Sequence, residues 1–257
     1  MGDALLSLDG VAKRFANGTE ALRGLSFAVA PGEFVALLGP SGCGKSTALR
    51  LAAGLLMPDE GAVAHAAGDV GFVFQEPTLM PWADALANAR LPLDIKGVPR
   101  GEANERARAA LARAGLAGFE HAFPRELSGG MKMRVSLARA LCSFIAPARP
   151  KLLLLDEPFA ALDEITRWRL GDDLLRLWRE ERAREDAPLT VLFVTHSVSE
   201  SSYLSSRVLV MTPRPGRVAA DIALAPGRDS RLAPATIDAQ RRISDALTEA
   251  MSGTAAA

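Results

Sequence analysis

Residues 39–47 read Gly39-Pro40-Ser41-Gly42-Cys43-Gly44-Lys45-Ser46-Thr47 and match the phosphate-loop pattern G-x-x-x-x-G-K-[ST] at every fixed position. Residues 33–38 before the loop are typical of a buried strand, and residues 46–53 after it have the pattern of a helix. A glycine-rich turn at a helix N-terminus binds polyphosphate through backbone N–H groups and the helix dipole. The loop therefore predicts a nucleotide site in which Lys45 contacts the β- and γ-phosphates and Ser46 offers its hydroxyl to Mg²⁺.

The composition of the whole chain limits the class of protein. Its 257 residues are enough for one large core, or for a core with a subdomain. Lys+Arg and Asp+Glu each number 30, and a net charge of zero argues against a general nucleic-acid or anionic-membrane binder. The two cysteines, Cys43 and Cys142, are too few for a disulfide framework and suit a reducing compartment. Because no run of about 20 apolar residues occurs, we expect that the chain does not cross a membrane by itself.

Two strands are expected ahead of the phosphate loop, at residues 4–15 and 21–29, with an Asn-Gly turn signal between them. As a pair they predict an antiparallel edge beside a parallel nucleotide-binding sheet. Phe15 ends the first of these strands. It either presents an aromatic face to an adenine ring or belongs to the core, and the local pattern leaves both interpretations open.

A long apolar strand is followed by two carboxylates. Residues 152–155 are unbroken in their apolar character, which is typical of a central strand in a parallel sheet. Ligands of such sheets bind beyond the carboxyl ends of the strands. Asp156 is placed there to hold Mg²⁺ through water, and Glu157 to polarise an attacking water molecule.

Two further strands end in polar side chains. Residues 70–74 precede Gln75, and residues 189–195 precede His196. At the edge of a parallel sheet Gln75 can reach Mg²⁺ or an attacking water molecule, and His196 can contact a terminal phosphate. The alternative is structural, because a Gln in a loop and a single His more often have no catalytic role.

A second glycine-rich turn precedes a strongly helical segment. Residues 102–116 and 131–141 have helical spacing, and Ser128-Gly129-Gly130 interrupts the pattern between them. The turn is a second possible anion site at a helix N-terminus. Ser128 is also a suitable helix cap, and a cap and a phosphate contact can coexist.

These motifs, in this order along the chain, resemble the ATP-binding cassette (ABC) ATPase family over about residues 4–225. The Leu-Ser-Gly-Gly motif at residues 127–130, upstream of the Asp156-Glu157 pair, separates that family from other phosphate-loop enzymes. The resemblance implies an α/β fold: a phosphate-loop NTPase core with a mainly parallel sheet flanked by helices, an antiparallel β edge and an inserted α-helical subdomain. It implies an ABC ATPase domain at residues 1–229 with the subdomain at about 76–147, followed by a C-terminal helix and tail at 230–257.

The resemblance also implies roles for single residues. In the family pattern Phe15 stacks on adenine, residues 39–47 hold ATP, Gln75 contacts Mg²⁺ and water, and His196 is the switch histidine. Asp156 is the carboxylate on the Mg²⁺ side, and Glu157 is the general base. Such domains act as homodimers, so Ser128, Gly129 and Gly130 of one copy close over the γ-phosphate that Lys45 of the other copy holds, with Asp163 at the seam.

A finer resemblance joins the chain to the nitrate, sulfonate and taurine group of bacterial importer ATPases. It is carried by residues 73–82, 127–131, 162–167, 203–207 and 213–217. It implies a peripheral protein at the cytoplasmic face of the inner membrane, with integral membrane permease subunits as partners, a periplasmic substrate-binding protein as an indirect partner and no nucleic acid. The solute stays open.

Several alternatives remain at this point. The chain is either this transport ATPase, a soluble non-transport ABC ATPase, or a regulatory cassette that holds ATP without turnover. The apolar cluster Leu79, Met80, Pro81 and Trp82 either docks the permease or belongs to the core of the helical subdomain. Residues 142–149 and 182–188 are longer than the family pattern and are expected to be surface insertions.

Overall fold

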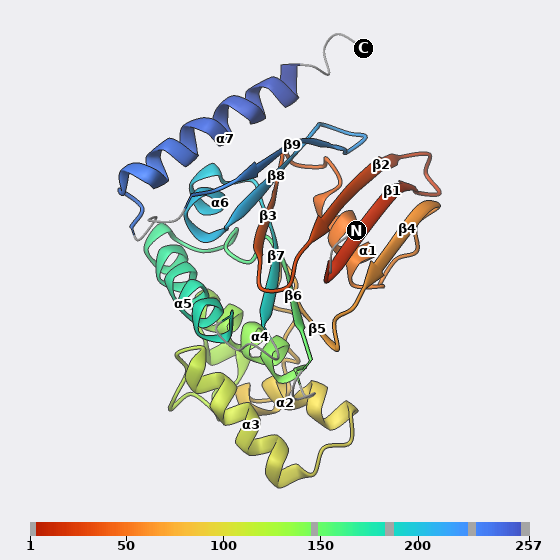
Figure 1. Cartoon of the computed structure of the whole chain (residues 1–257). Coiled ribbons are helices and arrows are strands. Elements are labelled where there is room, and N and C mark those ends of the chain that lie inside the picture. Colours follow the sequence, from red (N-terminus) through yellow and green to blue (C-terminus); the bar gives the residue numbers. More distant parts are fainter. Residues whose placement is uncertain (1–3, 145–148, 183–187, 226–229, 253–257) are drawn as a thin grey trace. The chain divides into compact units, whose positions relative to one another are not determined.

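The computed structural model describes residues 4–144, 149–182, 188–225 and 230–252. The chain divides into two compact units, one formed by Met1–Ala67 with Thr190–Ala257 and the other by Gly68–Leu189. Figure 1 labels the helices and strands of both units. Each unit is described by itself below.

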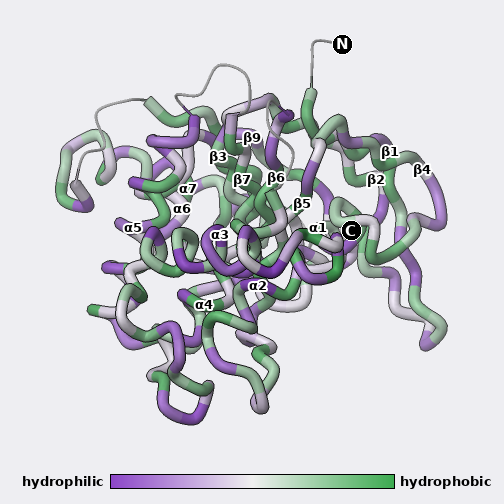
Figure 2. Tube along the Cα trace, turned by 90° about the horizontal axis from the view of Figure 1, so that it is seen from below, coloured by the Kyte–Doolittle hydropathy of each residue, from purple (hydrophilic) through white to green (hydrophobic). Residues whose placement is uncertain are grey.

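The first unit contains a parallel sheet that positions the phosphate loop. Strand β3 (Phe34–Leu38) pairs in parallel with β7 (Leu189–Thr195) on one side and with β8 (Arg207–Met211) on the other. Strand β9 (Val218–Ala223) then pairs antiparallel with β8. Every residue of β3 and β7 is buried, and most of these residues are hydrophobic (Figure 2).

The antiparallel strands form a sheet of their own. Strands β1 (Leu6–Arg14) and β2 (Glu20–Val29) pair as expected, and β4 (Glu60–His65) adds to the free side of β1 in the order β2-β1-β4. The sequence placed the pair at the edge of the parallel sheet and gave no strand at β4. Strand β4 is short, rich in small residues and exposed at five of its six positions, so it lacks the apolar alternation that marks a strand.

Three helices complete the first unit. Helix α1 (Lys45–Ala52) follows the phosphate loop, and α6 (Val198–Leu204) follows β7. Helix α7 (Pro234–Ser252) packs on α6, β8 and β9 (Figure 1). It confirms the predicted C-terminal helix, and its buried residues recur at the spacing of one helix face: Thr236, Ala239, Ile243 and Ala250.

The second unit joins two strands to a group of helices. Strands β5 (Asp69–Val73) and β6 (Lys151–Asp156) pair in parallel, and α5 (Glu164–Arg182) follows β6. Between the two strands lie α2 (Ala85–Ile95), α3 (Arg100–Arg113), a short 3₁₀ turn at Pro124–Glu126 and α4 (Gly129–Cys142).

The inserted helices share a hydrophobic core of their own. Helices α2, α3 and α4 pack on one another, and small side chains such as Ala89, Ala103 and Ala107 are fully buried between them. Helix α2 was not expected as a separate helix, because Pro92 lies inside it and weakens the sequence signal. Its N-terminus is marked by Asp84, whose carboxylate accepts from the Ala87 amide at 2.7 Å.

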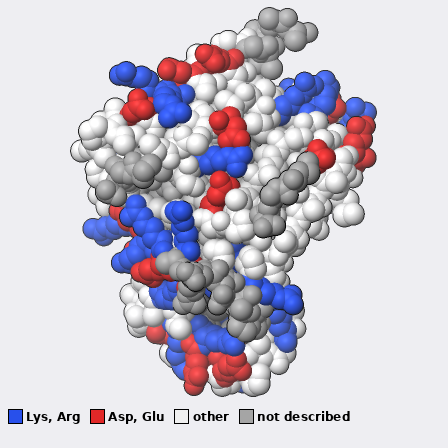
Figure 3. Space-filling model, viewed as in Figure 1, with Lys and Arg blue, Asp and Glu red and all other residues white. Residues whose placement is uncertain are grey.

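The surface agrees with the balanced composition. Basic and acidic side chains are interspersed on the face shown in Figure 3. Within the described ranges, none of the helices combines the length and the apolar character needed to span a bilayer.

Candidate functional site

The phosphate loop lies between β3 and α1, as the sequence predicts. Gly44 is the N-cap of α1 and has a φ of 105°, and a Cβ there would lie 2.7 Å from the Ala21 carbonyl oxygen. Only glycine fits both the left-handed backbone and this close approach. The Lys45 side chain is 4% exposed, and its Nζ donates to the carbonyl oxygens of Gly39 at 2.8 Å and Pro40 at 2.9 Å. The ammonium group is therefore held inside the loop.

A turn at residues 212–217 supports the outer side of the phosphate loop. A Cβ on Gly216 would lie 2.1 Å from the Cys43 carbonyl oxygen, so the two backbones touch. Arg214 Nε donates to the Gly42 carbonyl oxygen at 3.0 Å. The Gly216 amide also donates to the Ala21 carbonyl oxygen at 2.9 Å. The Pro-Arg-Pro-Gly pattern of this stretch signals a turn but does not reveal that the turn contacts the phosphate loop.

The pairing of β3 with β7 places His196 at the edge of the sheet where the phosphate loop begins. Leu38 and Thr195 are register partners in these parallel strands, and Gly39 and His196 follow them. His196 is exposed, while the next residue, Ser197, caps α6 by accepting from the Glu200 amide at 3.2 Å. The structure thus brings the phosphate loop and His196 together within the first unit.

In the second unit, parallel strand pairing likewise brings Gln75, Asp156 and Glu157 to the same edge of a sheet. Val73 and Leu155 are register partners in parallel β5 and β6, and Gln75 and Glu157 each follow two residues later. Asp156 is 2% exposed, whereas Gln75 is exposed. Glu157 has a φ of 44°, a left-handed conformation that non-glycine residues adopt at a cost of about 1–3 kcal/mol. Such strained residues are often found at functional sites.

The Ser128–Gly130 turn caps α4 and touches the start of α5. Ser128 Oγ accepts from the Met131 amide at 3.2 Å, which confirms Ser128 as a helix cap. A Cβ on Gly130 would lie 2.5 Å from Thr166 Cγ2, so the Thr166 side chain would have to shift to admit a larger residue there. Asp163 Oδ1 accepts from the Thr166 amide at 2.9 Å, and hydrogen bonds from Thr166 hold the pKa of Asp163 below its usual value. Ser128, Gly129 and Asp163 are exposed and face solvent.

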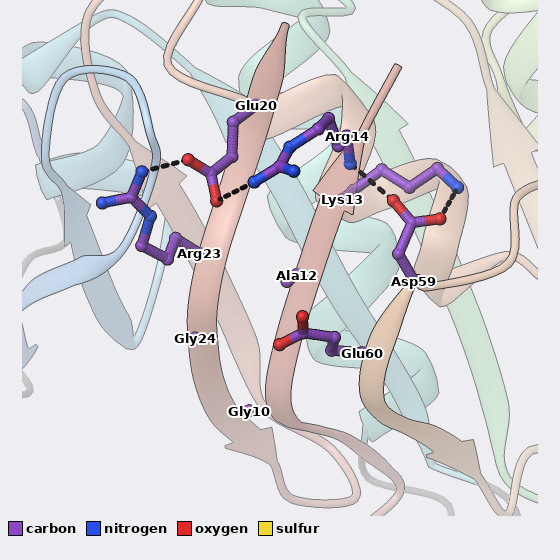
Figure 4. A pocket seen from close by; sticks show the side chains of 9 residues that line it. All are labelled: Gly10, Ala12, Lys13, Arg14, Glu20, Arg23, Gly24, Asp59 and Glu60. Carbon is purple, nitrogen blue, oxygen red and sulfur yellow. Dashed lines mark hydrogen bonds and ion pairs between the residues drawn. The ribbon is translucent and has the colours of Figure 1, made fainter. Parts of the chain in front are cut away.

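Phe15 directly follows β1 and is 37% exposed, which removes the interpretation of Phe15 as a core residue. Beside its strand lies a hollow of about 460 Å³ on the β1, β2 and β4 sheet (Figure 4). In that hollow Glu20 pairs with Arg23 and with Arg14, and the Arg23 hydrogen bond lowers the pKa of Glu20. Lys13 Nζ and Asp59 Oδ1 are 2.7 Å apart. The charges of the hollow are thus balanced among themselves.

The donor set fits a magnesium nucleotide better than a metal held by protein alone. No group of three or more His, Cys, Asp or Glu side chains suited to a metal occurs among the residues that the structure describes. Mg²⁺ usually takes one or two protein oxygens, water and substrate phosphates. In the first unit the Ser46 hydroxyl, in the first turn of α1, is an oxygen of this kind, and in the second unit the Asp156 carboxylate ends β6.

The comparison with known families agrees with this arrangement. A family model described as ABC transporter matches residues 22–160, which is more than half of the chain. The chain belongs to the ABC transporter family. An ABC protein with this phosphate loop and this Leu-Ser-Gly-Gly motif is an ATP-binding and ATP-hydrolysing subunit, which confirms the prediction from sequence.

Curated relatives cover most of the chain. An uncharacterised ABC transporter ATP-binding protein of Methanocaldococcus jannaschii is 46% identical over 79% of this chain and 74% of its own. A taurine import ATP-binding protein of Yersinia pestis is 41% identical and covers 80% of each chain. An aliphatic sulfonates import ATP-binding protein of Pseudomonas syringae is 45% identical and covers 85% of each chain.

Solved structures support the ABC fold. An ATP-binding cassette solved as a dimer in a post-hydrolysis state with ADP and phosphate matches with a TM-score of 0.72 and 32% identity, over 86% of this chain and 99% of that one. A Clostridium perfringens protein described as part of an ABC transporter complex matches with a TM-score of 0.73 and 27% identity, over 85% and 88%.

Proposed function

We propose that this ABC ATPase energises the import of a small solute of the taurine, sulfonate or nitrate type through separate membrane permease subunits. The observation that supports this proposal is the similarity to a taurine import ATP-binding protein over 80% of the chain and to an aliphatic sulfonates import ATP-binding protein over 85% of the chain. A periplasmic substrate-binding protein delivers the solute to the permease, and the ATPase is peripheral at the cytoplasmic face of the inner membrane. Residues 1–229 form its ATPase domain.

The phosphate loop and the strand ends hold Mg·ATP in this proposal. Backbone amides of residues 39–47 and the Lys45 ammonium bind the phosphates, and Phe15 stacks on the adenine ring. Ser46, Gln75 and Asp156 are the residues that would hold Mg²⁺, and the ion would supply positive charge against the phosphates. The burial of Asp156 and the exposure of Phe15 and Gln75 support these roles.

Glu157 is the proposed general base. Its carboxylate takes a proton from the attacking water, Gln75 helps to orient that water, and His196 contacts the γ-phosphate. Lys45 and the loop amides stabilise the charge that develops on the transferred phosphoryl group. The left-handed backbone of Glu157 supports this role, because strained backbone of this kind is often found at functional sites.

The second glycine-rich turn acts on the nucleotide of a partner copy. In a homodimer, Ser128, Gly129 and Gly130 of one protomer donate to the γ-phosphate bound by the other, and Asp163 lies at the seam. ATP binding closes the dimer, since each γ-phosphate gains donors from the opposite protomer, and hydrolysis removes that bridge. The exposure of Ser128 and Gly129 supports this assignment, as does the dimeric state of a similar cassette with ADP and phosphate.

The permease surface is proposed at the loop after Gln75. Trp82 is 76% exposed, an unusual position for a large aromatic side chain in a folded protein. Leu79 packs partly against the hydrophobic core of the inserted helices, so the apolar cluster is divided between core and surface. We assign the exposed Trp82 side to the permease contact.

Growth of a deletion strain tests the transport function. We expect the strain to lose growth on taurine, an alkanesulfonate or nitrate as the single sulfur or nitrogen source, and to keep growth on sulfate and ammonium. The wild-type gene should restore growth, and a Glu157→Gln variant, which keeps the phosphate loop, should not. Restoration by Glu157→Gln would favour a cassette without turnover, and normal growth of the deletion strain on all three solutes would favour a non-transport ATPase.

A further inference from the structure

Arg139 joins helix α4 to the loop that follows Gln75. Its Nη1 donates to the Thr78 carbonyl oxygen at 2.9 Å, and its Nη2 donates to the Pro77 carbonyl oxygen at 2.8 Å and to Thr78 Oγ1 at 3.0 Å. The guanidinium is half-buried, and burial lowers the pKa of Arg139 from its usual value. Charge-assisted bonds from a planar fork to two successive carbonyls fix both position and orientation.

The backbone that Arg139 holds is strained. Thr78 has a φ of 46°, and Thr78 and Glu157 are the two non-glycine residues with positive φ in the described part of the chain. For a β-branched side chain this left-handed conformation is a clear outlier. A strained residue keeps its conformation only when its surroundings impose it, and Arg139 supplies two hydrogen bonds to Thr78 and one to the carbonyl oxygen of the preceding Pro77.

Helix α4 connects this anchor to the Ser128–Gly130 turn. The helix begins at the Ser128 cap and continues to Cys142, so Arg139 lies on the same rigid element, about 16 Å along the axis from the turn. Gln75 precedes Thr78 by three residues in the loop that Arg139 holds. A single side chain therefore ties the Gln75 loop to the helix that carries the second glycine-rich turn.

We propose that Arg139 is a positioning residue for ATP hydrolysis: it imposes the left-handed conformation at Thr78 and thereby fixes Gln75 relative to the Ser128–Gly130 turn. The proposal rests on the proposed role of Gln75 in the ATP site. Without Arg139, Thr78 relaxes to an ordinary conformation and Gln75 leaves its place. ATP still binds, because the phosphate loop is unchanged, and turnover falls.

The test separates this role from simple packing. Arg139→Gln should lower kcat roughly tenfold, with KM for Mg·ATP changed less than about twofold, because only positioning for the chemical step is lost. Adding Thr78→Gly should return kcat to within about threefold of wild type, since glycine adopts positive φ without help. If Arg139 only packed within α4, adding Thr78→Gly would not restore kcat.

Arg134→Gln is the matched control on the same helix. Arg134 donates to the Ala114 carbonyl oxygen at 2.7 Å and pairs with Asp173 at 2.6 Å, away from the Gln75 loop. It should lower the melting temperature and leave kcat unchanged. An unchanged kcat in Arg139→Gln, or no rescue by Thr78→Gly, overturns the proposal.

A second variant decides the matter if Arg139→Gln does not fold. Thr78→Val keeps Arg139 but removes the Oγ1 acceptor and places a less tolerant residue at positive φ, so kcat should fall without a matching change in KM. An unchanged kcat in this variant overturns the proposal. Turnover and binding of a fluorescent ATP analogue by the wild type come first: a wild type that binds but does not hydrolyse ATP refutes the proposed ATPase role instead.

Discussion

At the scale of single residues, close backbone contacts decide where the phosphate loop lies. Gly216, which lies in a separate turn, touches the carbonyl oxygen of the loop residue Cys43. Gly44, which lies in the loop itself, touches the carbonyl oxygen of Ala21. Neither glycine can take a side chain without moving the loop. The loop motif alone reveals the need for Gly44 but not for Gly216, since that need comes from a turn more than 170 residues away.

Gly216→Ala should weaken ATP binding and destabilise the protein. The new Cβ would lie 2.1 Å from the Cys43 carbonyl oxygen, which forces the turn away from the loop at a cost of about 1–3 kcal/mol. Titration with a fluorescent ATP analogue and urea unfolding measure the two effects. Gly101→Ala is the control, because a Cβ there meets nothing within 4 Å and alanine should raise helix stability by about 0.5 kcal/mol. Equal ATP affinity in Gly216→Ala and wild type would show that the turn does not support the loop.

Both thiols should be inert in the folded protein. Cys43 is 1% and Cys142 is 5% exposed, and burial raises the pKa of Cys142 to about 12, so almost no thiolate exists at pH 8. We expect iodoacetamide to label neither cysteine in native buffer and both in urea, as read by mass spectrometry. Labelling of Cys142 in native buffer would contradict the packing described at the end of α4.

At the scale of elements, the strands that carry the site are the ones that the sequence predicts best. Strands β3, β6 and β7 are buried on both faces, so their apolar runs are unbroken and easily found. Strand β4, helix α2 and helix α6 were missed for physical reasons. Strand β4 is exposed, α2 contains Pro92, and α6 is a seven-residue helix with three serines that pack tightly by tertiary contacts.

Three elements of the second unit meet at one buried carboxylate. Glu181 of α5 lies 2.8 Å from Lys151 of β6 and 2.8 Å from Arg113 of α3. Burial opposes ionisation of Glu181, but the Lys151 hydrogen bond and the two cationic charges outweigh it, so the pKa of Glu181 is below its usual value. A lowered carboxyl pKa contributes stability above the unfolded pKa, and this contribution is lost as pH falls through the folded pKa.

Glu181→Gln should lower the free energy of unfolding by about 2 kcal/mol at pH 7, less than for a fully buried pair because Arg113 is 39% exposed. The difference from wild type should shrink below about pH 4, where the unfolded carboxyl binds its proton. Urea unfolding at several pH values measures this difference in the free energy of unfolding. Glu180→Gln, one residue earlier and exposed, should change stability by less than about 0.5 kcal/mol. A difference that does not vary with pH would contradict the ion-pair account.

At the scale of the whole molecule, the order of motifs along the chain predicted the family and the candidate site residues. What it could not predict are the side chains that hold the motifs in place. Arg139 and Arg214 bond to backbone carbonyls that are 61 and 172 positions away in sequence, and no local pattern records such partners. Phe15 shows the same limit, since its exposure, which separates a surface ring from a core ring, is set by the folded sheet.

We propose that Glu157 drives hydrolysis of ATP enclosed between two copies of this chain. ATP turnover together with gel-filtration mass, in Mg·ATP, for wild type and Glu157→Gln tests this directly. Wild type should hydrolyse ATP, while the variant should bind ATP, lose turnover by about 100-fold or more and elute as a dimer. A Glu157→Gln variant that hydrolyses ATP at the wild-type rate would contradict it.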